Sequence, residues 1–120
     1  MGLSLESALK FFDSWKNEFV RSPTVEVCLF PSYPHLVPCL EKIRKLGLHL
    51  EVGGQDCSTE PEGAFTGEVS ARMLKEIGCH YVLIGHSERR QRANETNDTL
   101  SKKTFSRMEG TSFSSCILLG

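Results

Sequence analysis

The sequence predicts an α/β protein built from parallel β-α units. Helical spacing of apolar residues alternates along the chain with short apolar strands, in the order α-β-α-β-α-β-α-β. The run Tyr81–Ile84 has no polar alternation, which is typical of a strand covered on both faces. Such alternation favours parallel strands joined by crossover helices. A doubly wound open sheet and a closed eight-fold barrel both use these units, and the periodicity does not choose between them.

The first helix and the first strand follow one another directly. Apolar residues on one helical face predict a helix that Ser4 caps and Pro23 ends: Leu5, Ala8, Leu9, Phe12, Trp15 and Phe19. The segment Val25–Phe30 alternates and is rich in β-forming residues, so it is predicted to be a strand. Pro31 stops that strand.

The middle of the chain repeats this pattern. Four residues at helical spacing predict a second helix: Leu36, Leu40, Ile43 and Leu46. Gly47 lies where a left-handed C-cap belongs. A short strand, Leu48–Val52, leads into a polar loop from Gly53 to Glu68. Ser70 then caps a third helix. The apolar stripe of that helix is Met73, Leu74 and Ile77, and Gly78 closes it.

The final third of the chain begins with the apolar strand Tyr81–Ile84. A polar segment follows, with a weakly periodic helix from Thr96 to Met108. The last strand is predicted at Cys116–Leu119.

Composition narrows the class of protein. The chain has 120 residues, the length of one domain, and a net charge of −1, which gives no long-range attraction to nucleic acid or to an anionic membrane. There is no secretory signal pattern and no run of about 18 apolar residues. Five widely spaced cysteines without a CxxC pair favour free thiols in the cytoplasm. A zinc site that uses Cys79 and His80 is the alternative, although zinc ligands usually occur in closely spaced pairs.

The most informative segment is Gly85-His86-Ser87-Glu88-Arg89-Arg90, directly after the apolar strand. In both β/α architectures the functional groups gather at the carboxyl ends of the strands. Gly85 permits a sharp turn there, and Ser87 and Glu88 suit the first positions of a short helix. His86 is therefore expected to face a helix N-terminus, which disfavours the imidazolium and keeps the ring neutral.

Together with its surroundings, this segment resembles triosephosphate isomerase. The matching runs are Tyr81-Val-Leu-Ile-Gly-His86-Ser-Glu-Arg-Arg90, Gly54-Gln-Asp-Cys57, Gly63-Ala-Phe-Thr-Gly-Glu-Val-Ser70, Met73-Leu-Lys-Glu-Ile-Gly78, Asn94-Glu-Thr-Asn97 and Ser101-Lys-Lys103. The dense part of the resemblance covers residues 53–103, with looser agreement before it. It implies an incomplete (β/α)8 barrel, with residues 1–120 forming about half of it, roughly from the first helix to the fifth strand.

The resemblance also implies an activity, the interconversion of dihydroxyacetone phosphate and glyceraldehyde 3-phosphate through an enediolate in glycolysis and gluconeogenesis. No cofactor and no metal are required. The counterpart of His86 is the neutral electrophile that polarises the substrate carbonyl, a role for which this family serves as the general example. Ser87 and Glu88 lie beside it, and Glu88 is the counterpart of an acid that helps to hold a catalytic lysine.

A homodimer is implied as well. In the family, the loop that matches Gln55 to Glu68 reaches into the neighbouring subunit, and the counterpart of Thr66 lies at its tip, next to Gly67. Glu68 and Arg89 resemble positions that pair across this interface, which has the two-fold symmetry typical of dimers.

Several family residues have no counterpart in the sequence. Met1 aligns with a methionine that follows the family's asparagine and catalytic lysine, and the glutamate base would follow Gly120. The 120-residue chain is therefore expected to have little or no isomerase activity. The alternative is a non-catalytic fragment or interaction module that docks through the Gln55–Glu68 loop onto a full-length subunit.

A basic cluster offers a different interpretation as a nucleic-acid surface: Arg89, Arg90, Arg92, Lys102 and Lys103. However, Glu88, Glu95 and Asp98 interleave with these cations, and no aromatic residues are placed for base stacking. We therefore expect a solvated face with salt bridges and no nucleic-acid partner.

Overall fold

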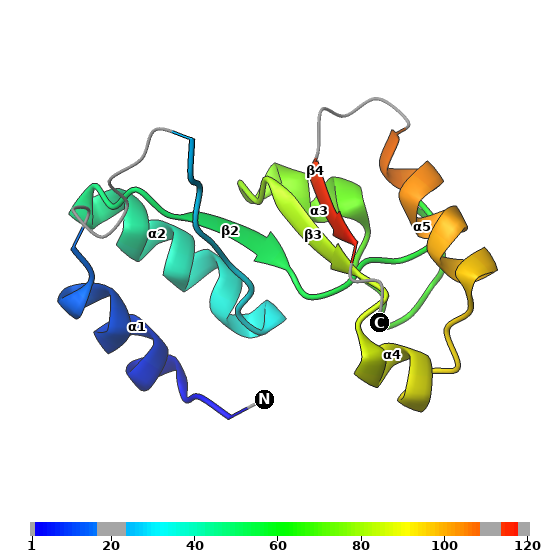
Figure 1. Ribbon diagram of the computed structural model, residues 1–120, viewed down its shortest axis with the longest axis horizontal. Coiled ribbons are helices and arrows are strands. Elements are labelled where there is room, and N and C mark those ends of the chain that lie inside the picture. Colours follow the sequence, from blue (N-terminus) through cyan, green and yellow to red (C-terminus); the bar gives the residue numbers. More distant parts are fainter. Residues whose placement is uncertain (1, 17–23, 109–113, 118–120) are drawn as a thin grey trace.

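The computed structural model describes residues 2–16, 24–108 and 114–117, with the side chains of 106–108 and 114–117 left out. In chain order the elements are α1 (Leu5–Ser14), β1 (Cys28–Leu29), the 3-10 turn η2 (Tyr33–His35), α2 (Leu36–Leu46), β2 (Glu51–Gly54), α3 (Ala71–Glu76), β3 (Tyr81–Ile84), α4 (Ser87–Arg92), α5 (Asn97–Met108) and β4 (Ser114–Ile117). Figure 1 shows α1 and α2 side by side at one end of the molecule and α5 at the other.

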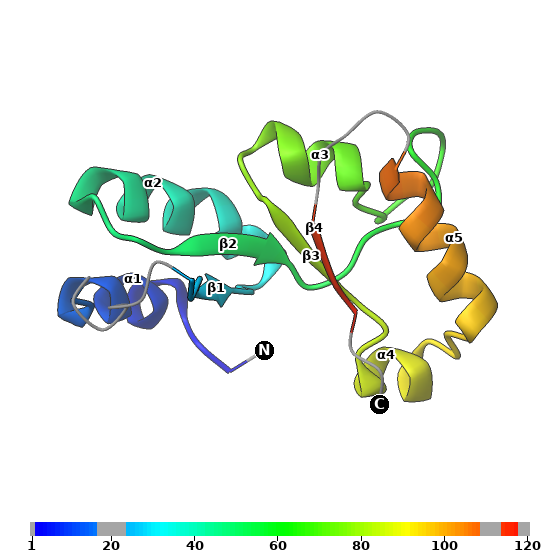
Figure 2. The ribbon, with the colours of Figure 1, turned by 45° about the horizontal axis from the view of Figure 1, so that its top comes forward.

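The four strands of the described residues form a parallel sheet whose spatial order, β1-β2-β3-β4, is the order of the chain. A doubly wound sheet reverses its strand order at a switch point, whereas a barrel adds each strand beside the last. The described part of the chain contains no such reversal. The expected α/β class is confirmed, and the topology is that of a partial β/α barrel (Figure 2).

Local side-chain chemistry sets the helix ends as expected. The hydroxyl of Ser4 accepts a hydrogen bond from the Ser7 amide at 3.1 Å, and the Ser70 hydroxyl accepts from the Met73 amide at 3.2 Å. Gly47 takes the left-handed conformation, with φ of 61°, and ends α2. These caps fix where the helices meet the strands.

Several element bounds differ from those expected. The helix α1 stops at Ser14, whose hydroxyl donates to the Phe11 carbonyl and competes with helix propagation, while Phe19 lies outside the described residues. The strand β1 has two residues rather than six. The strand β2 begins only at Glu51 and runs into two glycines, which sequence propensity disfavours. The last strand starts at Ser114, two residues early, and residues 118–119 lie outside the description.

The core lies between the sheet and the helices. Val82 and Ile84 of β3 are fully buried, while Tyr81 and Leu83 of the same strand are half-buried. Among the described residues, the other fully enclosed side chains are Leu36, Cys39, Val52, Cys57, Leu74 and Cys79. One expectation for α3 is wrong: Met73 and Ile77 belong to its predicted apolar stripe but are exposed, and Leu74 alone of the three enters the core.

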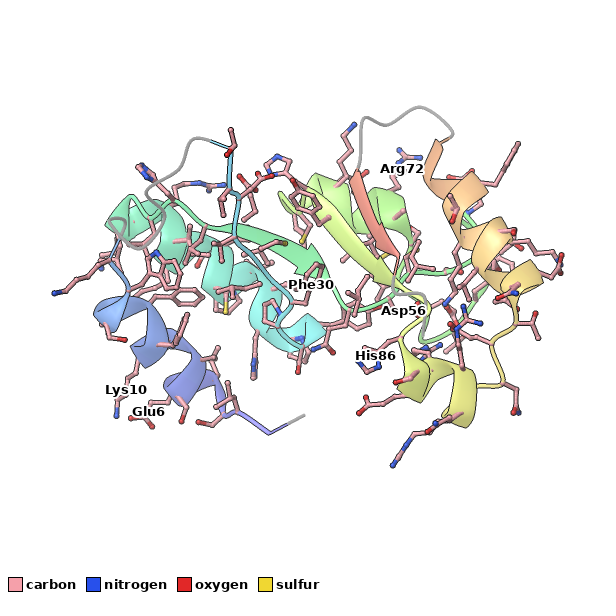
Figure 3. All side chains as sticks on the ribbon, viewed as in Figure 1. Glu6, Lys10, Phe30, Asp56, Arg72 and His86 are labelled. Carbon is pink, nitrogen blue, oxygen red and sulfur yellow. The ribbon has the colours of Figure 1, made fainter. Side chains whose placement is uncertain are left out.

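The glycine pair in β2 allows close packing across the sheet. A Cβ atom on Gly53 would lie 2.5 Å from the Phe30 ring and 2.7 Å from the Tyr81 carbonyl oxygen. A Cβ atom on Gly54 would lie 2.6 Å from the Leu74 side chain. Both contacts are shorter than packed carbon atoms tolerate. The two glycines therefore let Phe30, which Figure 3 labels, and Leu74 close over the strand.

This packing predicts that Gly53→Ala destabilises the fold. The added methyl group meets the main chain of β3, which moves only if the sheet moves, so we expect a loss of about 1–3 kcal/mol in the free energy of unfolding. Urea unfolding measures the change. Gly2→Ala is the matched control, because no described atom lies within 4 Å of its Cβ position. An unchanged transition in Gly53→Ala would show that the sheet packs less tightly there.

Candidate active site at the carboxyl ends of the strands

His86 lies at the junction of a strand and a helix. It follows β3 by two residues and is the N-cap of α4. Gly85 takes φ of 78°, in the left-handed region, and turns the chain sharply at this point. Figure 3 shows His86 at the start of α4, far from the exposed Glu6–Lys10 pair on α1. The histidine is therefore placed where the sequence predicted it.

A main-chain hydrogen bond determines which ring nitrogen carries the proton. The Glu88 amide donates to His86 Nδ1 at 3.2 Å, so Nδ1 must present its lone pair. The proton of the neutral ring then resides on Nε2, assigned here from the hydrogen-bond network. The Glu88 carboxylate is 3.9 Å from Nδ1, beyond hydrogen-bonding distance, and so does not compete. His86 can therefore donate a hydrogen bond through Nε2.

Four charged residues, three of them buried and Arg89 half-buried, form a cluster beside α4, which we call the buried ion cluster: Asp56, Arg89, Glu95 and Lys103. The Lys103 ammonium lies 2.6 Å from both Asp56 Oδ1 and Glu95 Oε1. The Arg89 guanidinium lies 3.1 Å from Asp56 Oδ2 and 2.9 Å from Glu95 Oε1. Two cations thus neutralise two carboxylates. The exposed fraction of Lys103 is only 3%, and that of Glu95 and Asp56 is 8% each.

The cluster changes the protonation equilibria of its own members. Burial raises the pKa of Asp56 above its usual range, although Lys103 partly offsets this. Burial also opposes ionisation of Glu95, but hydrogen bonds from Lys103 and Arg89 outweigh it and lower the pKa of Glu95. All three of those hydrogen bonds reach Glu95 Oε1, and Oε2 has no partner among the described residues.

The buried ion cluster joins elements that are distant in sequence. Asp56 follows β2, Arg89 lies on α4, Glu95 precedes α5 and Lys103 lies on α5. The main-chain carbonyl of Asp56 also accepts a hydrogen bond of 2.6 Å from the Tyr33 hydroxyl, which comes from the turn after β1. The segments after three adjacent strands are thereby fastened together at the end of the sheet that carries His86.

The local sequence pattern does not reveal this cluster. The pattern predicts that Glu95 and Lys103 lie on a solvated face, and for these two buried residues that prediction is wrong. The Asp98–Lys102 pair on the same helix is exposed, as expected. Lys103 is buried because Asp56, 47 residues earlier, lies against it, and no local pattern reveals that contact.

The predicted interface loop has a buried base and an exposed tip. Asp56, Cys57 and Ser58 are buried, and the Ser58 amide donates to the Val69 carbonyl at 2.8 Å, which closes the loop. Thr66, Gly67 and Glu68 are all exposed at the tip.

The remaining predicted site residues lie around this loop. Gln55 is exposed, but its side-chain amide donates to the Phe30 carbonyl at 2.8 Å. Arg89 points into the buried ion cluster of its own chain, with 43% of its side chain still exposed. Ser87 and Glu88, in the first turn of α4, are exposed beside His86.

The cysteine and the histidine of the alternative zinc site lie apart from His86. Burial raises the pKa of Cys79 to about 11, and His80 Nδ1 lies 2.5 Å from a Glu51 carboxylate oxygen. Both residues lie at the opposite end of β3. Among the described residues, no group of three or more His, Cys, Asp or Glu is arranged to hold a metal ion. No helix of the described chain is long and apolar enough to cross a bilayer.

Parallel strands in chain order, with a histidine N-cap at the carboxyl end of β3, define a β/α-barrel chain with its candidate active site at the strand ends. A family model described as triosephosphate isomerase matches residues 1–117. The chain therefore belongs to the triosephosphate isomerase family.

Curated triosephosphate isomerases from several bacteria are similar to the chain. The one from Clostridium botulinum (strain Loch Maree / Type A3) is 46% identical over 84 residues, which is 70% of this chain and 33% of the relative. The one from Coxiella burnetii (strain Dugway 5J108-111) is 41% identical over 100 residues, or 83% and 38%. The one from Solibacter usitatus (strain Ellin6076) is 39% identical over 101 residues, or 84% and 40%. The chain thus spans between a third and two fifths of these relatives.

The buried ion cluster predicts that Lys103→Met is strongly destabilising. The methionine fits the volume but leaves Asp56 and Glu95 facing each other with one cation, so we expect a loss of about 3–5 kcal/mol in the free energy of unfolding. Lys102→Met on the same helix removes only an exposed pair and should cost less than about 1 kcal/mol. Urea unfolding of both variants tests this, and equal losses would refute a special role for the buried lysine.

Proposed function

We propose that the protein containing these residues is a triose-phosphate isomerase in which His86 is the electrophile. The observation that carries the proposal is the hydrogen bond from the Glu88 amide to His86 Nδ1. It leaves Nε2 as a neutral N–H donor at the carboxyl end of β3, where a substrate carbonyl would be held. The family model and the curated relatives support the reaction itself.

The proposed chemistry interconverts dihydroxyacetone phosphate and glyceraldehyde 3-phosphate. A base removes a proton from the carbon next to the carbonyl, and negative charge develops on the carbonyl oxygen as the enediolate forms. A hydrogen bond from His86 Nε2 to that oxygen stabilises the charge as it develops. The substrate carbonyl activates its own α-protons, so the proposal needs no cofactor. The resemblance also implies a glutamate base and a lysine, and neither has a counterpart among the matching residues of this sequence.

A homodimer and a cytoplasmic, glycolytic role are part of the same proposal. The exposed tip of the loop, at Thr66 to Glu68, supports an interface, because the base of the loop is fastened while its tip makes no buried contact within the described chain. The non-catalytic interaction module is not favoured by the comparisons, since every relative named here carries the enzyme's name.

A chimera tests the role of His86. Residues 53–103 replace the matching segment of the Clostridium botulinum relative, and we expect the chimera to retain isomerase activity. His86→Asn keeps a side chain that caps a helix but loses the Nε2 donor, so kcat should fall by about 10²–10³-fold. His80→Asn is the matched control and should leave kcat unchanged. A His86→Asn chimera as active as its parent would overturn the proposal.

The 120-residue polypeptide by itself is a separate test. It contains the electrophile but no counterpart of the base or the lysine, so we expect no isomerase turnover above background. General-base catalysis alone contributes about 10²–10⁴-fold. A coupled assay with glyceraldehyde 3-phosphate measures the rate, with the full-length Clostridium botulinum relative as positive control. Turnover near that of the relative would contradict the expected loss.

A further inference from the structure

Arg90 holds the two peptide groups on either side of His86. Its main-chain amide donates to the His86 carbonyl at 3.1 Å, within the first turn of α4. Its side-chain Nε donates to the Gly85 carbonyl at 3.2 Å. The carbonyl of Gly85 and the carbonyl of His86 itself thus both accept a hydrogen bond from Arg90. We propose that Arg90 is a positioning residue for His86, an inference that rests on the proposed function.

The guanidinium of Arg90 is itself anchored. Its Nη1 donates to Asn97 Oδ1 at 2.9 Å, and Asn97 is the first residue of α5. One edge of the planar guanidinium therefore donates to the Gly85 carbonyl after β3, and another donates to the Asn97 side chain of α5. A lysine has a single ammonium group and cannot present donors in these two fixed directions. The arrangement requires arginine rather than a positive charge alone.

The contact matters because Gly85 is conformationally free. Its φ of 78° is accessible to glycine at little cost, but a glycine can also leave that conformation easily. Rotation of the Gly85–His86 peptide group would swing the imidazole ring and weaken the hydrogen bond between His86 Nδ1 and the Glu88 amide. The side chain of Arg90 holds that peptide group from outside the strand.

This role is distinct from that of the buried ion cluster. Arg89 reaches Asp56 and Glu95, whereas neither carboxylate contacts Arg90 in the structure. Arg89 fixes where α4 lies, and Arg90 fixes the main chain at the point where α4 begins. Arg92 is the matched control, because its exposed side chain on the same helix makes no hydrogen bond or ion pair with any described residue.

The test measures the His86 tautomer by long-range ¹H–¹⁵N NMR of the full 120-residue chain at alkaline pH. The resonances of the four histidines are assigned by loss of signal in His86→Asn. In the parent chain we expect an unprotonated Nδ1 and a protonated Nε2. In Arg90→Met the two nitrogen shifts should move toward each other as both tautomers become populated, and in Arg92→Met they should not move.

Two further variants decide the case if Arg90→Met does not fold. Asn97→Leu removes the anchor of the guanidinium and should shift the tautomer in the same direction, whereas Asn97→Asp keeps an acceptor and should restore the parent spectrum. A parent-like tautomer in folded Arg90→Met or in Asn97→Leu overturns the proposal. Arg90→Lys should resemble Arg90→Met, because a point charge does not replace the fork.

Measurement of kcat and KM in the Clostridium botulinum chimera tests whether Arg90 affects catalysis. There Arg90→Met should lower kcat by about 10- to 100-fold with KM little changed, because the histidine acts on charge that develops after binding. Arg92→Met should be neutral, and a fall confined to KM would overturn the positioning role. Different results would contradict the two proposals. An active His86→Asn chimera would contradict the proposed function, whereas the positioning role of Arg90 is tested by the tautomer of the 120-residue chain, a measurement that needs no enzyme activity.

Discussion

The arrangement of the strand ends depends on the buried ion cluster. Transfer of charged groups out of water costs several kcal/mol per ion unless each finds a partner. Asp56, Glu95 and Lys103 are buried in this cluster, and Arg89 keeps 43% of its side chain exposed. Here two cations and two carboxylates pair at distances of 2.6–3.1 Å, so the charges of the cluster sum to zero. The opposite pKa shifts of Asp56 and Glu95 reflect the balance between burial and pairing. Any movement of α4 or α5 away from the loop after β2 would expose an unpaired charge to the protein interior.

The buried ion cluster divides the loops at the carboxyl ends of the strands into an anchored part and an exposed part. The segment from Asp56 to Ser58 is held by the cluster, by the Tyr33 hydroxyl and by the Val69 carbonyl. The loop beyond it, through Thr66, is exposed. A functional group on an anchored helix start keeps its geometry better than one on a free loop. His86 belongs to the anchored part, whereas the loop tip is available to a partner.

The sequence predicted those features that depend on neighbours within a few residues. Ser4, Gly47 and Ser70 end or begin helices through contacts that span three or four positions, so their residue types alone located them. The order of strands and helices followed from periodicity in the same way. The motif at His86 likewise combines a turn and a cap within six residues, and its family resemblance identified the role that we propose for it.

The features that sequence reasoning missed depend on residues far apart in the chain. In the sequence Lys103 has the pattern of a surface lysine. Its partner Asp56 is 47 residues earlier and reaches it only in the folded chain. Met73 matches a buried helical stripe, yet α3 turns Leu74 toward the sheet because the glycines of β2 leave space there. The strand bounds shifted for the same reason, since the pairing partner rather than β-propensity decides where a strand begins.

The two consecutive arginines show how local sequence and tertiary contact combine at the site. Neighbouring positions on a helix point about 100° apart, because an α-helix has 3.6 residues per turn. Arg89 can therefore face the buried ion cluster while Arg90 faces the end of β3 and α5. One arginine sets the position of the helix that carries the histidine, and the other sets the peptide group from which the histidine side chain projects. Neither contact alone would determine the direction of Nε2, since a well-placed helix can begin with a rotated peptide group. The orientation of His86 thus depends on two consecutive arginines, Arg89 and Arg90, that point in different directions from the same helix.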